Sequence, residues 1–324
     1  MINFTPASIR TWSRLGSNAS FGLAAKELAL IEDNLVILTA DLCTYSGLDR
    51  FKAEFPDKLH NCGIAEQNML GVAAGLAKEG FTPFATTYAT FASLRCGDQV
   101  RVNMGIMKLP IKLVGLSGGL SAGILGATHM SVEDVAVMRA IPNITVISPA
   151  DCTETVKATL AAAKLSVPVF IRLTGTMNIP IVYQTDYDYE IGKSITLRRG
   201  SDICIVATGT MVHTSLLTAD ILEQKGISCT VIDMHTLQPL DTSVIDDAIS
   251  CRLIVTVEEH SVVGGLGSAV AEHLALKRTR PQHLIVGIPR NYPSAGEYEY
   301  LLERCGLTPS KISSRIMKVR EENV

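Results

Sequence analysis

Residues Gly63–Ala77 read GIAEQNMLGVAAGLA, a stretch of small and apolar residues that contains a single acid, Glu66. The apolar residues recur at steps of three and four, which predicts a helix. Glycine and alanine keep several sides of this helix narrow, so another backbone can approach it closely. A carboxylate at the head of such a segment is costly to bury unless it meets a partner. Glu66 is therefore a candidate functional residue, although a lone glutamate in a helix is usually solvated.

The chain has 324 residues, which predicts two domains, and its composition of 47% hydrophobic and 19% charged residues is typical of a globular protein. The net charge of -3 and the absence of long Lys/Arg runs argue against a nucleic-acid or membrane-surface partner. Eight scattered cysteines without a C-x-x-C pair argue against a zinc or redox motif. No signal-peptide or membrane-spanning pattern is visible in the sequence, and we expect a cytoplasmic protein.

Short apolar runs alternate with helical patterns in the first half of the chain. Strands are expected at 35–40, 83–87, 111–116, 144–148 and 167–173. Helices are expected after possible caps at Ser17 or Asn18, over 91–107, over 131–140 with a capping-box pattern, and over 153–165. Because the strands are apolar on both faces, this rhythm predicts a doubly wound parallel sheet.

The pattern changes at 175–192, a segment with Pro180, several tyrosines and acids, which we interpret as a linker with room for a small hairpin. A second alternation follows, with strands at 203–207, 228–233, 253–257 and 283–287 and helices at 211–225, 241–250 and 267–277. The tail over 307–323 has polar helical spacing. The predicted fold is α/β, with two sequential doubly wound domains of mainly parallel sheets. The bounds are 1–176, a linker over 177–192, and 193–324.

Four other residues could carry chemistry in the first domain. Asp41 follows a predicted strand, and acids at the carboxyl ends of parallel strands are well placed for a site. Tyr88 and Phe91 bracket a strand-to-helix turn, although core packing alone would explain them. His129 lies in a glycine-rich loop, where a side chain that exchanges protons near neutral pH can approach a ligand, although such a histidine is more often simply exposed.

Taken in order, these segments resemble the carboxyl-terminal part of transketolase and of 1-deoxyxylulose-5-phosphate synthase, from about residue 13 to 307. The matching motifs are GIAEQ at 63–67, Tyr-x-Thr-Phe at 88–91 with Asp98–Gln99, G-x-x-G-x-Thr-His at 123–129, SPAD at 148–151, and EEH at 258–260 with GGLGSAV at 264–270.

The resemblance implies thiamine diphosphate as the cofactor. It implies that Glu66 hydrogen-bonds a ring nitrogen of the aminopyrimidine, which favours the imino tautomer that takes the proton from the thiazolium carbon. A carboxyl in apolar surroundings is suited to sharing a proton with a weak base. Phe91 would stack on the aminopyrimidine with Tyr88 close by, Asp41 would lie on the cofactor side, and His129 would contact the substrate's oxygen atoms and move protons.

One motif of the family is missing. The diphosphate and Mg²⁺ of these enzymes are held by a Gly-Asp-Gly segment and a later Asn, and this sequence contains no Gly-Asp-Gly. The resemblance therefore implies a β-type subunit of a split transketolase that holds the pyrimidine half of the active site and no metal ligands of its own. A separate amino-terminal subunit would supply the diphosphate side and Mg²⁺, in an α₂β₂ heterotetramer. We expect the helix behind Glu66 to pack against a second protomer.

The sequence departs from the family around the substrate. Leu125 replaces an Asp that contacts a sugar hydroxyl, Gly175 replaces a phosphate-binding Arg, and Ser117–Gly118 fall near the place of a His or Arg. Arg14 matches a phosphate-contacting Arg, and Ser46 is assigned to a neighbouring Ser. Phosphate recognition is therefore expected to be weakened or rebuilt. The glycines at 264–267 loosely match a dinucleotide loop, but we interpret them as a structural turn.

Three alternatives stay open. The first is the β subunit of a 2-oxoacid dehydrogenase decarboxylating component, which shares both domains and the glutamate; the Thr128–His129 loop and GIAEQ favour transketolase instead. The second is an enzyme like deoxyxylulose-phosphate synthase. The third is a chain that serves only as an assembly or regulatory partner, against which Glu66, Phe91 and His129 argue.

Overall fold

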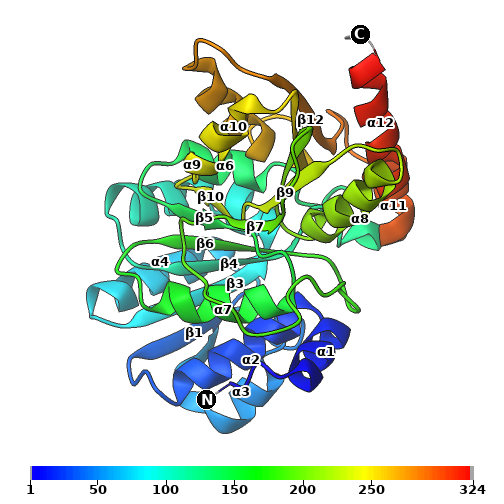
Figure 1. The fold of residues 1–324 in the computed structure, drawn as a ribbon. Helices are drawn as coiled ribbons and strands as arrows, with labels where there is room; N and C mark the ends of the chain where they lie inside the picture. The colour runs from blue at the N-terminus through cyan, green and yellow to red at the C-terminus, as the bar shows by residue number, and fades with distance from the viewer. Residues whose placement is uncertain (1, 322–324) are drawn as a thin grey trace.

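The computed structural model describes residues 2–321, and Figure 1 shows two α/β domains arranged one above the other. The first domain contains the strands β1 (Leu35–Thr39), β2 (Leu59–Asn61), β3 (Thr82–Tyr88), β4 (Lys112–Gly118), β5 (Thr145–Ile147) and β6 (Val169–Thr174). Its helices are α1 (Pro6–Leu15), α2 (Ser17–Ala29), α3 (Asp49–Glu54), α4 (Glu66–Lys78), α5 (Gly97–Gln99), α6 (Asp134–Ala140) and α7 (Cys152–Ala163).

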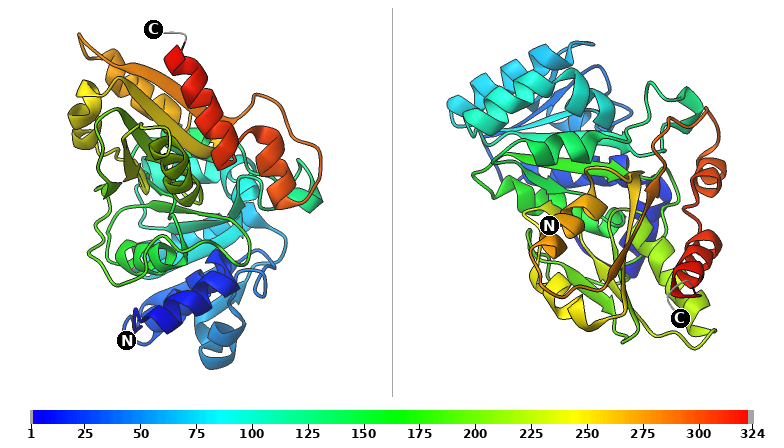
Figure 2. Two further views of the ribbon diagram at one scale, coloured as in Figure 1. Left: turned by 45° about the vertical axis from the view of Figure 1, so that its right-hand side comes forward. Right: turned by 90° about the horizontal axis from the view of Figure 1, so that it is seen from above.

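The second domain forms its own five-stranded sheet. Its strands are β7 (Ile195–Arg198), β8 (Ile203–Ala207), β9 (Cys229–Asp233), β11 (Leu253–Ser261) and β12 (Gln282–Ile288), in the order β12-β11-β8-β9-β7. Only β7 runs antiparallel to its neighbour. The helices are α8 (Met211–Glu223), α9 (Ser243–Asp247), α10 (Leu266–Ala275), α11 (Tyr298–Cys305) and α12 (Pro309–Glu321), and α12 packs on α8 along the outside of the molecule (Figure 2).

The first sheet contains seven strands, because one strand comes from the second domain. Its order is β10-β5-β6-β4-β3-β1-β2, where β10 (Thr236–Gln238) pairs antiparallel with β5 and the other strands are parallel. Helices α2, α3 and α7 contribute the apolar cluster on one face, and α4 and α6 contribute the cluster on the other, which continues into the second domain. The predicted class, two sequential α/β domains with mainly parallel sheets, is confirmed.

Several local predictions were wrong. The helix expected over 131–140 begins only at Asp134, because Ser131 bridges to Gly118 and Gly119 at the edge of the sheet. The helix α2 has Gly16 as its N-cap, and neither Ser17 nor Asn18 caps it. The predicted helix over 91–107 is broken into π-helical turns at Phe91–Arg95 and Val100–Ile106 with α5 between them.

The segment 175–194 contains neither a helix nor a strand, so the small hairpin that the sequence allowed is absent from this described part of the chain. Residues 322–323 of the predicted C-terminal helix lie outside the described residues. No helix within residues 2–321 has the length and hydrophobicity that crossing a membrane requires.

Candidate active site

Glu66 is the first residue of helix α4, and its side chain is buried. A carboxylate in the first turn of a helix is stabilised by the unpaired backbone N–H groups at that end. The guanidinium of Arg95 supplies the opposite charge, and its Nη1 donates a hydrogen bond of 2.7 Å to Glu66 Oε1. Only 5% of the Glu66 side chain is exposed, against 45% of the Arg95 side chain. The buried acid that the sequence singled out therefore has a partner, which the sequence analysis did not identify.

Tyr88, Phe91 and His129 form one cluster of rings, which we call the aromatic cluster. Tyr88 ends β3, Phe91 begins the following π-helical turn, and His129 comes from the glycine-rich loop. Their ring centroids are 5.3–5.7 Å apart in edge-to-face geometry, which is favourable for aromatic pairs. Burial raises the pKa of the Tyr88 hydroxyl, so this group stays a neutral donor.

Phe91 also contacts Arg95. The Arg95 guanidinium lies over the Phe91 ring, with Cζ 3.9 Å from the centroid. Arg95 therefore contacts Glu66 and Phe91 at the same time. A spacing of four residues on a helix brings the two side chains to one side, and this was the signal in the sequence that could have pointed to Arg95.

Asp41 lies two residues after the end of β1, with a left-handed backbone (φ +60°), and is exposed. Asn61 holds it through two reciprocal hydrogen bonds. Asn61 Nδ2 donates to Asp41 Oδ1 at 2.8 Å, and Asp41 N donates to Asn61 Oδ1 at 3.0 Å. The same Asn61 oxygen accepts from Gly63 N at 3.0 Å, which ties Asp41 to the turn that leads into α4.

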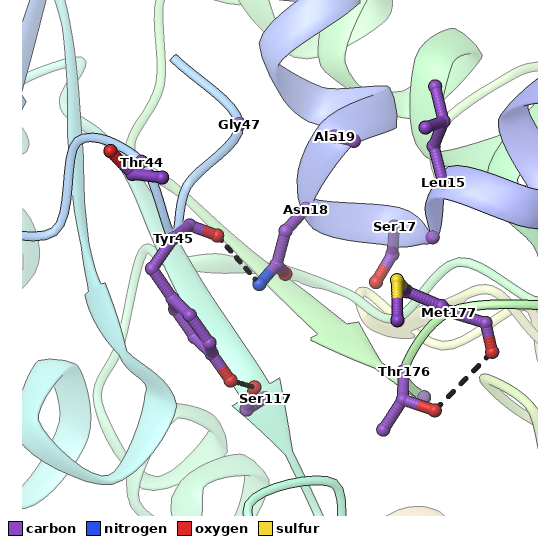
Figure 3. Close-up of a pocket in the computed structure, with 12 residues that line it drawn as sticks. Leu15, Ser17, Asn18, Ala19, Thr44, Tyr45, Gly47, Ser117, Thr176 and Met177 are labelled. Carbon is purple, nitrogen blue, oxygen red and sulfur yellow. Dashed lines mark hydrogen bonds between the residues drawn. The ribbon is translucent and has the colours of Figure 1, made fainter. Parts of the chain in front are cut away.

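A cavity of about 550 Å³ opens beside the aromatic cluster, between the start of α2, the carboxyl end of β4 and the loops after β1 and β6 (Figure 3). Tyr45 links the cavity to the aromatic cluster. Its ring centroid is 5.0 Å from that of Tyr88, and its hydroxyl lies 2.7 Å from Oγ of Ser117, which lines the cavity. Asn18 Nδ2 donates to Tyr45 O from the opposite wall. Among the described residues that line the cavity none carries a charge.

The two residues expected at a phosphate, Arg14 and Ser46, do not line this cavity, but each is next to a lining residue in the chain. Arg14 is exposed at the end of α1, directly before Leu15, which lines the cavity. Ser46 is buried, with its hydroxyl 3.1 Å from Thr86 Oγ1, and it does not line the cavity. Tyr45, the residue before Ser46, does line the cavity, and the sequence analysis did not single it out.

The other matching motifs have structural roles. Glu258 Oε2 accepts from Leu266 N at 2.7 Å and its Oε1 accepts from Gly267 N at 2.8 Å, so this carboxylate occupies the start of α10 in the GGLG turn. Glu259 Oε1 accepts from Leu120 N at 2.6 Å and joins the two domains. Asp151 caps α7 through Glu154 N. These contacts support the interpretation of residues 264–267 as a structural turn.

The fold and the contacts of Glu66 and Phe91 define a class of site. A buried carboxylate beside an aromatic face, near the carboxyl ends of parallel strands, suits a planar group that donates a hydrogen bond and stacks. The guanidinium of Arg95 is such a group, and it satisfies both contacts. Within residues 2–321, no group of three or more acids, histidines or cysteines could hold a metal ion.

Comparisons with known proteins assign the family. The family "Transketolase, pyrimidine binding domain" matches residues 15–177, and "Transketolase, C-terminal domain" matches residues 192–312. The chain belongs to the transketolase family. Membership in this family implies thiamine diphosphate as the cofactor.

Three relatives match over nearly their full length. The chain is 39% identical to a 6-deoxy-6-sulfo-D-fructose transketolase subunit of Clostridium sp., covering 91% of each chain. It is 35% identical to a subunit of the apulose-4-phosphate transketolase of Phocaeicola vulgatus, over 89% of this chain and 92% of that one. A solved structure described as a split gene transketolase, inactive β4 tetramer, superposes with a TM-score of 0.85 at 37% identity, covering 94% of this chain and 97% of the other.

The related 1-deoxy-D-xylulose-5-phosphate synthases are longer. The chain is 35% identical to the enzyme of Synechococcus sp., and the match covers 92% of this chain but 46% of that enzyme. The predicted relation to both families is confirmed, and the match spans 91–92% of the two named transketolase subunits.

Proposed function

We propose that this chain is the pyrimidine-side subunit of a two-chain transketolase that moves a two-carbon ketol unit from a ketose donor to an aldose acceptor. An amino-terminal subunit would complete the site with the diphosphate pocket and Mg²⁺, in an α₂β₂ assembly. The absence of Gly-Asp-Gly from the sequence supports this proposal. The proposal is also supported by the match to relatives that are named as transketolase subunits, which covers 91–92% of their length.

The contact of Glu66 and Phe91 with one planar cation carries the proposal, because an aminopyrimidine needs the same two neighbours. When bound, thiamine diphosphate supplies the nucleophilic carbon and the electron sink for breaking and forming the carbon–carbon bond. Glu66 would hold a proton at the ring nitrogen from its buried position, and Phe91 would orient the ring by stacking. Tyr88 would support Phe91 from the side, at 5.7 Å between centroids.

His129 is proposed to exchange protons with the substrate's oxygen atoms, because an imidazole can do so near neutral pH. Its Nδ1 lies 3.0 Å from Thr128 Oγ1, and this contact orients the ring. Nε2 would then be the nitrogen that exchanges protons with the substrate. Edge contacts to Tyr88 and Phe91 fix the ring beside the proposed cofactor position.

The cavity beside Tyr45 is proposed to hold the sugar. Tyr45, Ser117 and Asn18 offer hydroxyl and amide groups to sugar hydroxyls. The substrates in the names of the two relatives, a sulfo-sugar and a sugar phosphate, both have an anionic end. We propose that Arg14, next to the cavity wall, contacts such a group, and that Tyr45 rather than Ser46 is the hydroxyl beside it.

Reconstitution tests this function. The purified chain would be mixed with its amino-terminal subunit, Mg²⁺, thiamine diphosphate, a ketose donor and an aldose acceptor, and the exchanged sugars would be quantified. We expect ketol transfer only from the complete mixture, and an inactive self-associated chain alone, as the name of the related β4 tetramer describes for that protein. Transfer by the isolated chain would contradict the two-chain proposal. Release of CO₂ from a 2-oxoacid without ketol transfer would favour the dehydrogenase alternative.

A further inference from the structure

Arg95 makes the two contacts that the proposed function assigns to the cofactor ring. Its Nη1 donates to Glu66 Oε1 at 2.7 Å, and its Cζ lies 3.9 Å from the Phe91 centroid. We propose that Arg95 is a built-in stand-in for the aminopyrimidine, occupying the half-site between Glu66 and Phe91 until the cofactor displaces it. This inference rests on the proposed function and adds a step to it, which is the exchange of one planar group for another.

The chemistry of the two groups explains why one can replace the other. A guanidinium is planar, presents N–H donors along its edge to a carboxylate, and stacks on an aromatic face through its cationic π-system. An aminopyrimidine ring that binds Glu66 and Phe91 would use the same carboxylate edge and the same ring face. Both groups cannot occupy them at once, so cofactor binding requires the Arg95 side chain to leave.

The burial of the two partners shows what Arg95 does for Glu66. The Glu66 side chain is only 5% exposed, so a carboxylate there without a partner would be costly. The Arg95 side chain is 45% exposed, and an ion pair with one solvated member is worth little. Arg95 therefore satisfies the buried acid, yet holds it weakly enough for a ligand to compete.

The backbone around Arg95 lets the side chain move alone. The Arg95 carbonyl accepts a hydrogen bond of 3.0 Å from Gln67 Nε2, which ties this backbone to α4. The turn Phe91–Arg95 is π-helical, a form that is common at functional sites. Rotation of the half-exposed side chain into solvent would clear the Phe91 face while Phe91 and Glu66 stay in place.

Cofactor binding to the two-chain complex tests the inference. The association rate and affinity of thiamine diphosphate with Mg²⁺ would be measured by stopped flow and calorimetry for wild type and Arg95→Ala. We expect Arg95→Ala to raise the affinity about fivefold, the size expected for loss of a competing half-exposed ion pair. Arg101→Ala is the matched control, because Arg101 is an exposed arginine on the following π-helical turn, and it should leave binding unchanged.

A second measurement uses the wild-type chain and does not depend on how the variant folds. The Nε–H signal of Arg95 in the isotope-labelled complex should be shifted by the Phe91 ring before cofactor is added and should lose that shift on titration with thiamine diphosphate. A signal that stays unchanged while cofactor binds overturns the inference, as does equal or weaker binding by Arg95→Ala. If the wild-type complex binds no thiamine diphosphate, the proposed function fails, and this inference with it.

Discussion

The carboxylate of Glu66 is stabilised by its place at a helix N-terminus but is costly to bury. At the first position of α4 it is stabilised by the helix N-terminus, by about 0.3–1 kcal/mol for a charge in such a place. At the same time it is almost fully buried, and burial of a carboxylate is costly unless a partner lies within hydrogen-bonding reach. The catalytic role that we propose uses both properties, because the acid is fixed in direction and largely shielded from solvent.

Glu66→Gln tests this role at the residue scale. Glutamine keeps the size and one acceptor oxygen but cannot share a proton with the ring nitrogen, so exchange of the proton at the thiazolium carbon should fall by about 100-fold or more. Assembly with the partner subunit should be unchanged. Exchange would be followed by NMR in deuterated buffer on the reconstituted enzyme. Glu79→Gln, at the exposed C-cap of the same helix, is the control. Wild-type exchange in Glu66→Gln would rule out the role.

The candidate site could be predicted from sequence only in part. Motif spacing led to Glu66 and to Tyr88, Phe91 and His129, and the structure brings the three rings into contact. Arg95 was overlooked because an arginine in a helix is usually a surface residue, and its contact with Glu66 joins positions 29 residues apart. Such a contact depends on how α4 and the π-helical turn pack together.

At the scale of elements, the central strands were predictable because parallel strands covered on both faces are continuous apolar runs. β1, β3, β4, β6, β8 and β11 all lie within or close to the predicted ranges. The edge strands β2, β7 and β10 were not predicted, since each has three or four residues and owes its strand conformation to its neighbour in the sheet. Pairing with the sheet also explains why α6 begins later than predicted. Ser131 bridges to Gly118 and Gly119 instead of capping the helix.

Buried acids and tyrosines join three elements near the domain boundary. Glu154 of α7 and Asp233 of β9 are buried, and Tyr183 of the linking segment donates to Asp233 Oδ2 at 2.6 Å. Burial is the main cause that raises the pKa of Asp233 to about 7. Burial, together with the Asp233 charge, also raises the pKa of Glu154. The folded state is therefore most stable when Asp233 and Glu154 are protonated.

This cluster predicts a pH dependence of stability. The folded chain favours protonated Asp233, so between its ordinary pKa of 3.8 and about 7 the folded state binds more protons than the unfolded state. The stabilisation is complete below that range and is lost as pH rises through about 7. Relative to Asp233→Asn, wild type should lose free energy of unfolding across this range, as measured by urea unfolding at several pH values.

The exposed acid Asp247 provides the control for this experiment, since Asp247→Asn should leave the pH profile of wild type unchanged. Parallel profiles for wild type and Asp233→Asn would show that Asp233 keeps an ordinary pKa, contrary to this prediction.

At the scale of the whole molecule, the two domains form one interlocked body. β10 of the second domain completes the sheet of the first, and one apolar cluster runs from α4 through both sheets to α10. The buried Arg172 adds polar ties, donating to Asp134 Oδ2 at 2.7 Å and to Glu259 O at 2.9 Å. Glu66 and Phe91 are therefore built on one continuous frame, which agrees with our proposal that another chain, rather than movement between domains, completes the site.

The exposed side of α4 predicts where another protomer packs. Gly71, Val72 and Gly75 face outward on this helix, and a Cβ added to Gly71 or Gly75 would meet nothing within 4 Å in this chain. Gly75→Leu should therefore stabilise the monomer, since replacing a helical glycine gains up to about 1 kcal/mol, yet it should weaken assembly if a backbone packs closely there. Assembled mass would be measured by sedimentation, for the chain alone and with its partner subunit. Gly75→Ala is the graded control, with a similar gain in stability and a smaller loss of assembly. Assembly as strong as wild type in Gly75→Leu would mean that this face of α4 stays in solvent and that the protomers meet elsewhere.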